Sequence, residues 1–258
     1  MDSGFVRIEK SFENRVANLV IDRQEKMNSM TVAMRQGIGQ AFRDFSRDDH
    51  LRVVVVRGAG EKAFSSGGDV EEFLKLEPHE LAAWGEEMTE IERCPKPVIA
   101  AIDGYCFGAG MELALSCDIR VATDRALLGM PEVSLGMIPG SGGSQRVLRI
   151  LGMGRSKFLL MTARRIGAEE AARWGLISVC VPPEKLNETV NDVVVHLLKM
   201  PPLSLRAIKA VLQQGADASL SSALELERKT YAWLRTTQDY VEGVNAFLEK
   251  RPPHFKGK

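Results

Sequence analysis

Residues 98–122 read VIAAIDGYCFGAGMELALSCDIRVA. The aliphatic run Val98–Ile102 ends at an Asp-Gly pair, which is typical of a buried strand. Residues 108–116 start with small residues and continue with good helix formers, and residues 118–122 again favour a strand. A strand, a helix and a second strand in this order predict an α/β fold with right-handed crossovers between parallel strands.

The same alternation extends toward the N-terminus. Val16–Ile21 predicts a strand, and Thr31 is the predicted N-cap of a helix that runs toward Phe45 with apolar residues at helical spacing. Residues 51–57 are rich in valine and stop at Gly-Ala-Gly, so we expect a second buried strand there.

The pattern changes after the Pro-Pro pair at 182–183. Four helical segments follow with no strand between them, at 184–200, 203–214, Leu220–Leu234 and Gln238–Leu248. A second Pro-Pro pair at 201–202 separates the last three of them. We therefore expect an α/β core over residues 1–199 and a helical region over residues 200–258.

The charge balance excludes some classes of partner. The 258 residues contain 34 basic and 34 acidic side chains, so the formal net charge is zero. A hydrophobic content of 45% argues against disorder. Because nucleic-acid binding usually requires a basic excess, we expect no nucleic-acid partner.

The chain also shows no signal for a membrane. Its aliphatic runs are far shorter than the roughly 20 residues of a spanning helix. Residues 1–7 lack the basic and apolar regions of a signal peptide. The four cysteines, Cys94, Cys106, Cys117 and Cys180, form no Cys-x-x-Cys pair. Reduced, buried thiols and a cytoplasmic location are the prediction.

Several glycine-rich segments match known cofactor motifs only in part. Gly108-Ala109-Gly110 opens a helix after a strand, but Leu113 stands where a dinucleotide fingerprint needs a small residue. The segments at 140–144 and 152–157 do not match a phosphate-binding loop. The four histidines show no metal-ligand spacing. The sequence predicts neither a metal site nor a bound cofactor.

Two carboxylates stand out because their neighbours are apolar. Glu112 lies in the predicted helix, and Glu132 lies in the segment GMPEVSLGMIPG at 129–140. Burial raises the pKa of an unpaired carboxyl toward values useful for proton transfer. The plainer alternative is that Glu112 bonds a helix start and Glu132 caps a turn. Two loops nearby, around the glycines of 67–68 and at the helix start at 107–110, could each offer a backbone N–H to a carbonyl oxygen.

The segments 63–69, 104–118, 129–136 and 138–146, in this order, resemble the enoyl-CoA hydratase/isomerase (crotonase) family. The similarity runs nearly from end to end of the chain. It implies a spiral of ββα units, followed by a C-terminal helical region that forms homotrimers, often paired into homohexamers. By position, the two oxyanion-hole donors are the N–H groups of Gly68 and Ala109, although many relatives have glycine at the second place.

The resemblance also implies the reaction. Hydratases of the family carry two glutamates, here Glu112 and Glu132, whereas relatives that only shift a double bond often keep just the second. The implied substrate is a 2-enoyl-CoA thioester, so coenzyme A is part of the substrate and no further cofactor is expected. Glu112 is the expected base toward water, and Glu132 is the expected acid toward the carbon next to the thioester.

The similarity further suggests which residues hold coenzyme A. Those in the N-terminal half are Arg23, Lys26, Met27, Ala63, Ser65, Ser66, Asp69 and Val70. Tyr231, Phe247 and Lys250 correspond to C-terminal residues that close over coenzyme A in the family, with helix packing as the alternative for the two aromatic residues. Glu71 stands where many relatives have lysine, which weakens one expected phosphate contact.

Two other functions stay open. One is an enoyl-CoA isomerase that uses Glu132 alone, and the other is a non-catalytic protein that binds coenzyme A or RNA. The acyl preference is not predicted. The helical segment 78–92, with Leu81, Trp84 and Met88, is the expected wall of the acyl pocket.

Overall fold

The computed structural model describes residues 5–258. The chain divides into two compact units. The first unit contains the described residues up to Cys94 and the segment Val98–Asn191. The second unit contains Pro95–Pro97 and Asp192–Lys258. The division falls inside α7 (Leu186–Leu198), whereas the boundary expected from sequence lies just after this helix.

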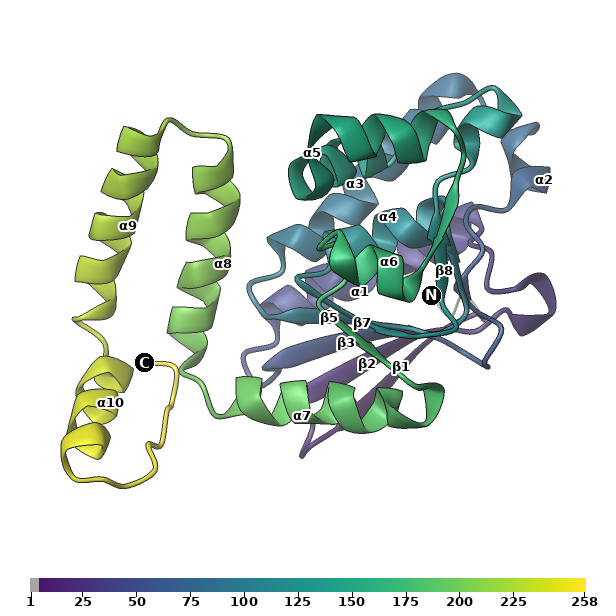
Figure 1. The fold of residues 1–258 in the computed structure, drawn as a ribbon. Helices are drawn as coiled ribbons and strands as arrows, with labels where there is room; N and C mark the ends of the chain where they lie inside the picture. The colour runs from purple at the N-terminus through teal and green to yellow at the C-terminus, as the bar shows by residue number, and fades with distance from the viewer. Residues whose placement is uncertain (1–4) are drawn as a thin grey trace. The chain divides into compact units, whose positions relative to one another are not determined.

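The larger sheet forms the base of the first unit (Figure 1). Within residues 5–258 it has six strands in the order β1-β2-β3-β5-β7-β10. These are β1 (Val6–Ser11), β2 (Val16–Ile21), β3 (Val53–Gly58), β5 (Val98–Ile102), β7 (Ile119–Thr123) and β10 (Val179–Val181). Only the β1–β2 pair is antiparallel. The four strands predicted from sequence all lie in the sheet, with ends shifted by at most two residues in β3 and one in β7.

A second sheet of four short strands has the order β4-β6-β8-β9 among the described residues. Its members are β4 (Ala63–Ser65), β6 (Tyr105–Phe107), β8 (Leu127–Gly129) and β9 (Arg165–Gly167). In three successive repeats, one strand enters the large sheet, the next enters the small sheet, and helical structure follows. This is the ββα spiral expected from the family resemblance. The short strands were not expected individually, because three residues are too few to show a periodic pattern.

The first unit also contains several helices. They are α1 (Val32–Arg47), α2 (Val70–Phe73), α3 (Pro78–Arg93), α4 (Ala109–Ser116), α5 (Gly143–Met161) and α6 (Ala168–Arg173), with 3-10 turns η1 (Gln24–Lys26), η2 (Glu132–Leu135) and η3 (Pro183–Lys185). All eight residues of α4 are buried, so this helix lies inside the unit rather than on its surface. The first N–H groups of such a buried helix need acceptors or a ligand.

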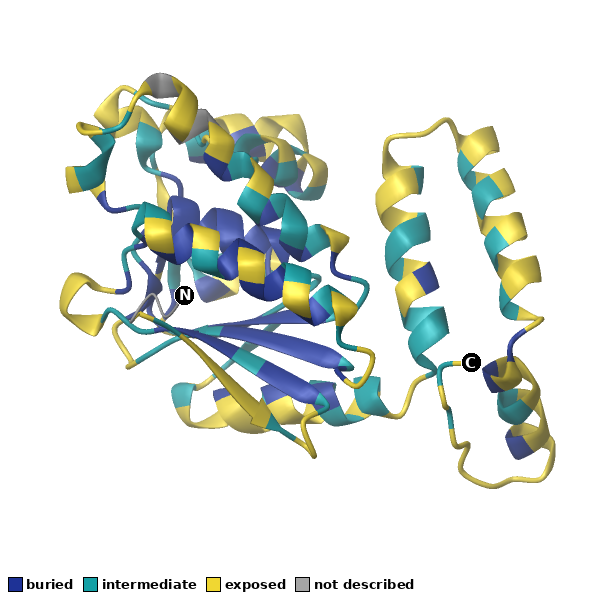
Figure 2. Ribbon diagram, turned by 180° about the vertical axis from the view of Figure 1, so that it is seen from behind, coloured by how far each residue is buried: buried dark blue, intermediate teal, exposed yellow. Residues whose placement is uncertain are grey.

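Figure 2 shows β1 as an exposed edge beside buried central strands.

The second unit contains α8 (Pro202–Ala216), α9 (Leu220–Leu234) and α10 (Gln238–Leu248). The residues after α10 fold back on its first turn, where the Asp239 carboxylate accepts the backbone N–H groups of Lys256 at 2.6 Å and Gly257 at 2.8 Å. Several large apolar side chains of these helices are exposed, namely Ile208, Leu212, Leu220, Leu224, Trp233, Val241, Val244 and Leu248.

Two further expectations concern the surroundings of the chain. Among residues 5–258 the four cysteines form no disulfide; Cys94, Cys106 and Cys117 are buried, and Cys180 is half-buried. Among residues 5–258, no helix combines the length and the apolar character needed to cross a membrane. The cytoplasmic location stays a prediction.

Candidate active site

A cavity of about 810 Å³ opens in the first unit between the loop after β4, the helices α2 and α3, the start of α4 and the segment around η2. Apolar side chains form most of its wall, including Val70, Phe73, Trp84, Val133, Leu135, Met137 and Ile138. The charged members of its lining are Arg35, Glu112 and Glu132. An apolar pocket with a few converging polar groups is the usual form of a small-molecule site.

Two backbone turns face each other in this cavity. Gly67 has a φ of 117° and precedes Gly68, while Gly108 has a φ of 50° and precedes Ala109, the first residue of α4. A Cβ atom on Gly67 would lie 3.7 Å from the Ala109 nitrogen, so only glycine leaves this space open. Within residues 5–258, the N–H groups of Gly68 and Ala109 have no acceptor. Two free donors on facing turns match the requirement for an oxyanion hole.

Glu112 enters the cavity from the first turn of α4, and its residue is only 3% exposed. Its Oε1 accepts the backbone N–H groups of Ser141 at 2.7 Å and Gly143 at 3.0 Å. Gly143 is the first residue of α5, so the carboxylate also faces the positive end of that helix. Glu112 therefore does bond a helix start, as the plainer alternative expected, and it lines the cavity at the same time.

Glu132 lines the same cavity and is the first residue of η2. Its Oε2 is buried and has no hydrogen-bond partner in the described part of the chain. A Cβ atom on Gly108 would lie 3.3 Å from Glu132 Oε1, so the carboxyl group lies against the turn that presents Ala109. Burial, with a smaller contribution from the nearby Glu112, raises the pKa of Glu132 to about 7. A carboxyl group with this pKa can hold or release a proton at neutral pH.

Comparisons with known proteins identify the family. The sequence profile of the enoyl-CoA hydratase/isomerase family matches residues 11–258. The short-chain-enoyl-CoA hydratase of Clostridium acetobutylicum is 34% identical over 255 residues, which cover 97% of each chain. The crotonyl-CoA hydratase of Syntrophomonas wolfei is 37% identical over 250 residues, covering 95% of this chain and 96% of the relative. The chain belongs to the enoyl-CoA hydratase/isomerase family.

Solved structures of the family show the same fold. The crystal structure of an enoyl-CoA hydratase from Bacillus anthracis matches this chain with a TM-score of 0.94 at 34% identity. The match covers 98% of this chain and 100% of that structure. The predicted crotonase-like α/β fold with a C-terminal helical region is therefore confirmed.

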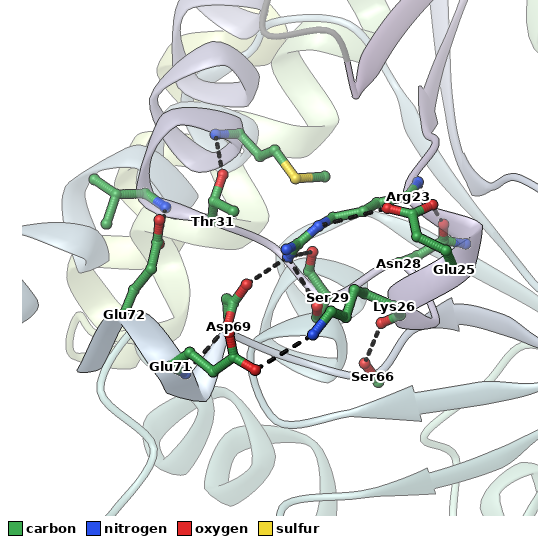
Figure 3. A network of polar contacts seen from close by, with 12 residues as sticks. Arg23, Glu25, Lys26, Asn28, Ser29, Thr31, Ser66, Asp69, Glu71 and Glu72 are labelled. Atoms are coloured by element: carbon green, nitrogen blue, oxygen red, sulfur yellow. Dashed lines mark hydrogen bonds and ion pairs between the residues drawn. The ribbon is translucent and has the colours of Figure 1, made fainter. Parts of the chain in front are cut away.

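Four of the predicted coenzyme A residues of the N-terminal half belong to the polar network of Figure 3, namely Arg23, Lys26, Ser66 and Asp69. Arg23 Nη1 lies 2.6 Å from Asp69 Oδ2 and also donates to Ser29. Lys26 Nζ lies 3.3 Å from Glu71 Oε1. Glu71, which stands where many relatives have lysine, thus forms an ion pair with Lys26. Much of the positive charge expected for phosphates is thus already offset within the chain.

The other predicted residues of this group differ in exposure. Ala63 and Ser65 are buried, and Ser65 Oγ donates to the carbonyl of Asn28 at 2.8 Å. Val70 and Met27 are exposed by 52% and 44% of their surfaces, and Ser66 lines the cavity. Ala63 and Ser65 therefore shape the loop, whereas the other three can contact a ligand.

Beside this network lies a smaller pocket of about 460 Å³, formed by the segments 24–28 and 59–63. It contains Met27 and Ala63 from the prediction and Lys62, which the sequence did not single out. Lys62 follows the sequence Gly-Ala-Gly-Glu at a bend, which is the pattern of an ordinary surface lysine.

The three predicted residues of the C-terminal half lie in the second unit. Tyr231 is 59% exposed on α9, and Phe247 is 83% exposed on α10. Lys250 follows α10 with a φ of 55°. Their contact with coenzyme A stays a prediction.

Of the three residues expected in the wall of the acyl pocket, Trp84 lines the cavity. Met88 is fully buried in the hydrophobic core, and the side chain of Leu81 lies outside the described residues. Sequence reasoning missed Arg35 and the backbone donors of Ser141 and Gly143. The segment Ile138-Pro139-Gly140 precedes a glycine-rich helix start, which is a pattern that predicts free N–H donors. Their acceptor, Glu112, lies about 30 residues earlier in the chain, so the pattern does not reveal it.

Proposed function

We propose that this chain is an enoyl-CoA hydratase, a lyase that adds water across the 2,3-double bond of a 2-enoyl-CoA thioester. The observation that carries the proposal is the pair of carboxyl groups, Glu112 and Glu132, on one cavity with two free backbone donors. The relatives named short-chain-enoyl-CoA hydratase and crotonyl-CoA hydratase support it.

The thioester carbonyl oxygen accepts the N–H groups of Gly68 and Ala109. These donors are fixed by the backbone, so they stabilise the charge that develops on the oxygen without rearranging. The start of α4 adds its positive end at the same point. Withdrawal of electrons toward the oxygen makes C3 of the enoyl group open to attack by water.

The two carboxyl groups divide the proton transfers. Glu112, as the carboxylate, accepts a proton from water while the water oxygen forms its bond to C3. Glu132, as the neutral acid, gives its proton to C2, and the electron pair of the double bond forms the new C–H bond. Relative to the substrate, the product has gained H on C2 and OH on C3. A proton must then pass from Glu112 to Glu132 before the next turnover.

Coenzyme A lies along Arg23, Lys26, Met27, Ser66, Asp69 and Val70, and the buried Ala63 and Ser65 hold the loop that faces it. Lys62 is the cation of the smaller pocket, which Glu25 and Glu61 also line, and Lys26 lies nearby in an ion pair with Glu71. We assign no further cofactor or metal. Tyr231, Phe247 and Lys250 close over coenzyme A in a homotrimer or homohexamer, and the exposed apolar residues of the C-terminal helices support assembly.

An enoyl-CoA isomerase is the second candidate. A single acid–base group with a pKa of about 7 could move a proton from one carbon to another, and Glu132 has this property. The tight double hydrogen bond to Glu112 favours hydration instead, because it holds a second carboxylate in the site. A non-catalytic protein that binds coenzyme A or RNA has no such use for either glutamate.

The test is a panel of straight, branched and cyclic 2-enoyl-CoA thioesters, followed by the loss of conjugated-enoyl absorbance. We expect hydration of at least one member and a 3-hydroxyacyl product by mass spectrometry. A product that has gained no water but has a shifted double bond would establish the isomerase. Binding without any conversion would leave the non-catalytic role.

The oxyanion hole is tested by Gly67→Ala, because its methyl group would fill the space beside the Ala109 N–H. We expect kcat to fall by about 10²–10³-fold, as for the loss of an oxyanion donor in other enzymes. Gly154→Ala is the control, since a Cβ there meets nothing within 4 Å. Equal activities of the two variants would contradict the proposed place of the thioester oxygen.

A further inference from the structure

Arg35 is the buried cation of the active-site cavity. It lies on α1 and is only 1% exposed, and its guanidinium carbon lies 3.6 Å from the centre of the Trp84 ring. The guanidinium also contacts the oxyanion loop, since a Cβ atom on Gly68 would overlap Arg35 Nη2. The positive charge therefore lies beside one of the two proposed donors.

The guanidinium lacks the partners that burial normally requires. Nε and Nη2 are buried and have no hydrogen-bond acceptor in the part of the chain that the structure describes. Most buried side-chain N–H groups are paired, and an unpaired one lowers the stability of the folded state. Stacking on Trp84 packs the guanidinium but supplies no hydrogen-bond acceptor, so these two nitrogens stay unpaired.

The charge of Arg35 is only partly offset. Burial lowers its pKa to about 10, while Glu112 and Glu72 act in the opposite direction, so the group is charged at neutral pH. Both carboxylates are bonded elsewhere. Glu72 Oε2 accepts the Val32 N–H at 2.8 Å, and Glu112 Oε1 accepts two N–H groups near the start of α5. A positive potential therefore extends into a cavity with largely apolar walls, where screening is weak.

We propose that Arg35 is a positioning residue of the oxyanion hole, whose buried charge strengthens the positive potential where the thioester oxygen becomes an enolate. The inference rests on the proposed function, because it requires the thioester oxygen at Gly68 and Ala109. A fixed cation stabilises the negative transition state more than the neutral carbonyl, so it raises kcat rather than binding. We expect a contribution of about 10- to 100-fold in kcat.

The experiment uses an enoyl-CoA with a 4-dimethylaminophenyl group on C3. Its absorption moves to longer wavelength when the carbonyl oxygen lies in a more positive potential. The spectrum of the bound probe is recorded for the wild type, Arg35→Met and Arg35→Lys. The same substitutions are made in a Glu112→Gln background, where the Glu112 charge cannot transmit an effect.

Arg35→Met should remove about half or more of the red shift, and Arg35→Lys should retain most of it, in both backgrounds. With a hydrated substrate, Arg35→Met should lower kcat by about 10- to 100-fold while KM changes by less than about threefold. Arg43→Met is the matched control, because Arg43 lies on the same helix and pairs with Glu87 away from the cavity lining.

Equal red shifts in the wild type and Arg35→Met would overturn the inference and leave the proposed function standing. A wild-type protein that binds the probe with no red shift would overturn both, since no oxyanion hole then acts on the carbonyl. Thermal unfolding identifies a structural role. We expect Arg35→Met to unfold at or above the wild-type temperature, because an unpaired buried charge has been removed. A lower unfolding temperature together with an unchanged spectrum would establish that Arg35 serves stability alone.

Discussion

Glu112 and Glu132 line the same cavity, but the chain surrounds them in opposite ways. Glu112 lies on a fully buried helix and receives two backbone N–H groups from the start of α5. Glu132 lies on a short 3-10 turn and has a buried oxygen without any partner in residues 5–258. The first group thus has hydrogen-bond donors fixed beside it, whereas burial raises the pKa of the second. The proposed roles of Glu112 as base and Glu132 as acid rest on this difference.

The largest expected effect comes from removing either carboxyl group. Glu112→Gln and Glu132→Gln should each lower kcat for hydration by about 10²–10⁴-fold, the usual contribution of an acid or base. The measurement is steady-state hydration of the best substrate from the thioester panel. Full hydratase activity in Glu112→Gln would remove the distinction between the two glutamates and favour isomerisation by Glu132.

The second effect is on the pH profile. Glu132 must be protonated to donate to C2, and its pKa in the folded protein is about 7. The hydration rate should therefore fall as pH rises through about 7, by up to about tenfold per pH unit above it. A profile of kcat/KM from pH 5 to 9 measures this. A rate that stays constant up to pH 9 would show that Glu132 is not the acid.

The smallest effect is on stability, and it has opposite signs at the two positions. Glu112→Gln should lower the free energy of unfolding by about 1–3 kcal/mol, since two hydrogen bonds lose their charged acceptor. Glu132→Gln should raise it at pH 8 by about 1–2 kcal/mol, because burial there opposes a charge on a partly exposed side chain.

The stability difference at Glu132 must also depend on pH. Its carboxyl group deprotonates near pH 4.5 when unfolded and near pH 7 when folded. Between these values the folded wild type binds more protons, so its stability falls as pH rises. The advantage of Glu132→Gln should therefore be absent below about pH 4.5, grow up to about pH 7 and then stay constant. Denaturant unfolding across this range checks it, and an equal offset at every pH would contradict the raised pKa.

The sequence predicted the parts of this contrast that depend on local pattern. Both glutamates stand out because their neighbours are apolar, and the glycine pairs of the two facing turns are visible as such. The strands Val16–Ile21 and Val98–Ile102 were predicted with the bounds observed, since continuous aliphatic runs mark buried strands.

The parts that the sequence did not reveal depend on contacts between distant segments. Arg35 follows the apolar Met34 on α1 and resembles a residue of the polar helix face. It is buried because Trp84 of α3, almost fifty positions later, covers it. The partners of Glu112 come from residues 141 and 143. The short strands of the second sheet likewise depend on pairing, which a three-residue pattern does not show.

A side chain at position 68 and the Arg35 guanidinium would occupy the same space, so the two positions are sterically coupled. A Cβ atom on Gly68 would overlap Arg35 Nη2 and lie 2.6 Å from Phe73 Cζ. A larger residue at 68 is therefore not accommodated while Arg35 and Phe73 keep their present positions. Once a shorter side chain replaces Arg35 and Phe73 shifts, the same change at 68 finds room. The effects of substitutions at positions 35 and 68 on stability should therefore not be additive.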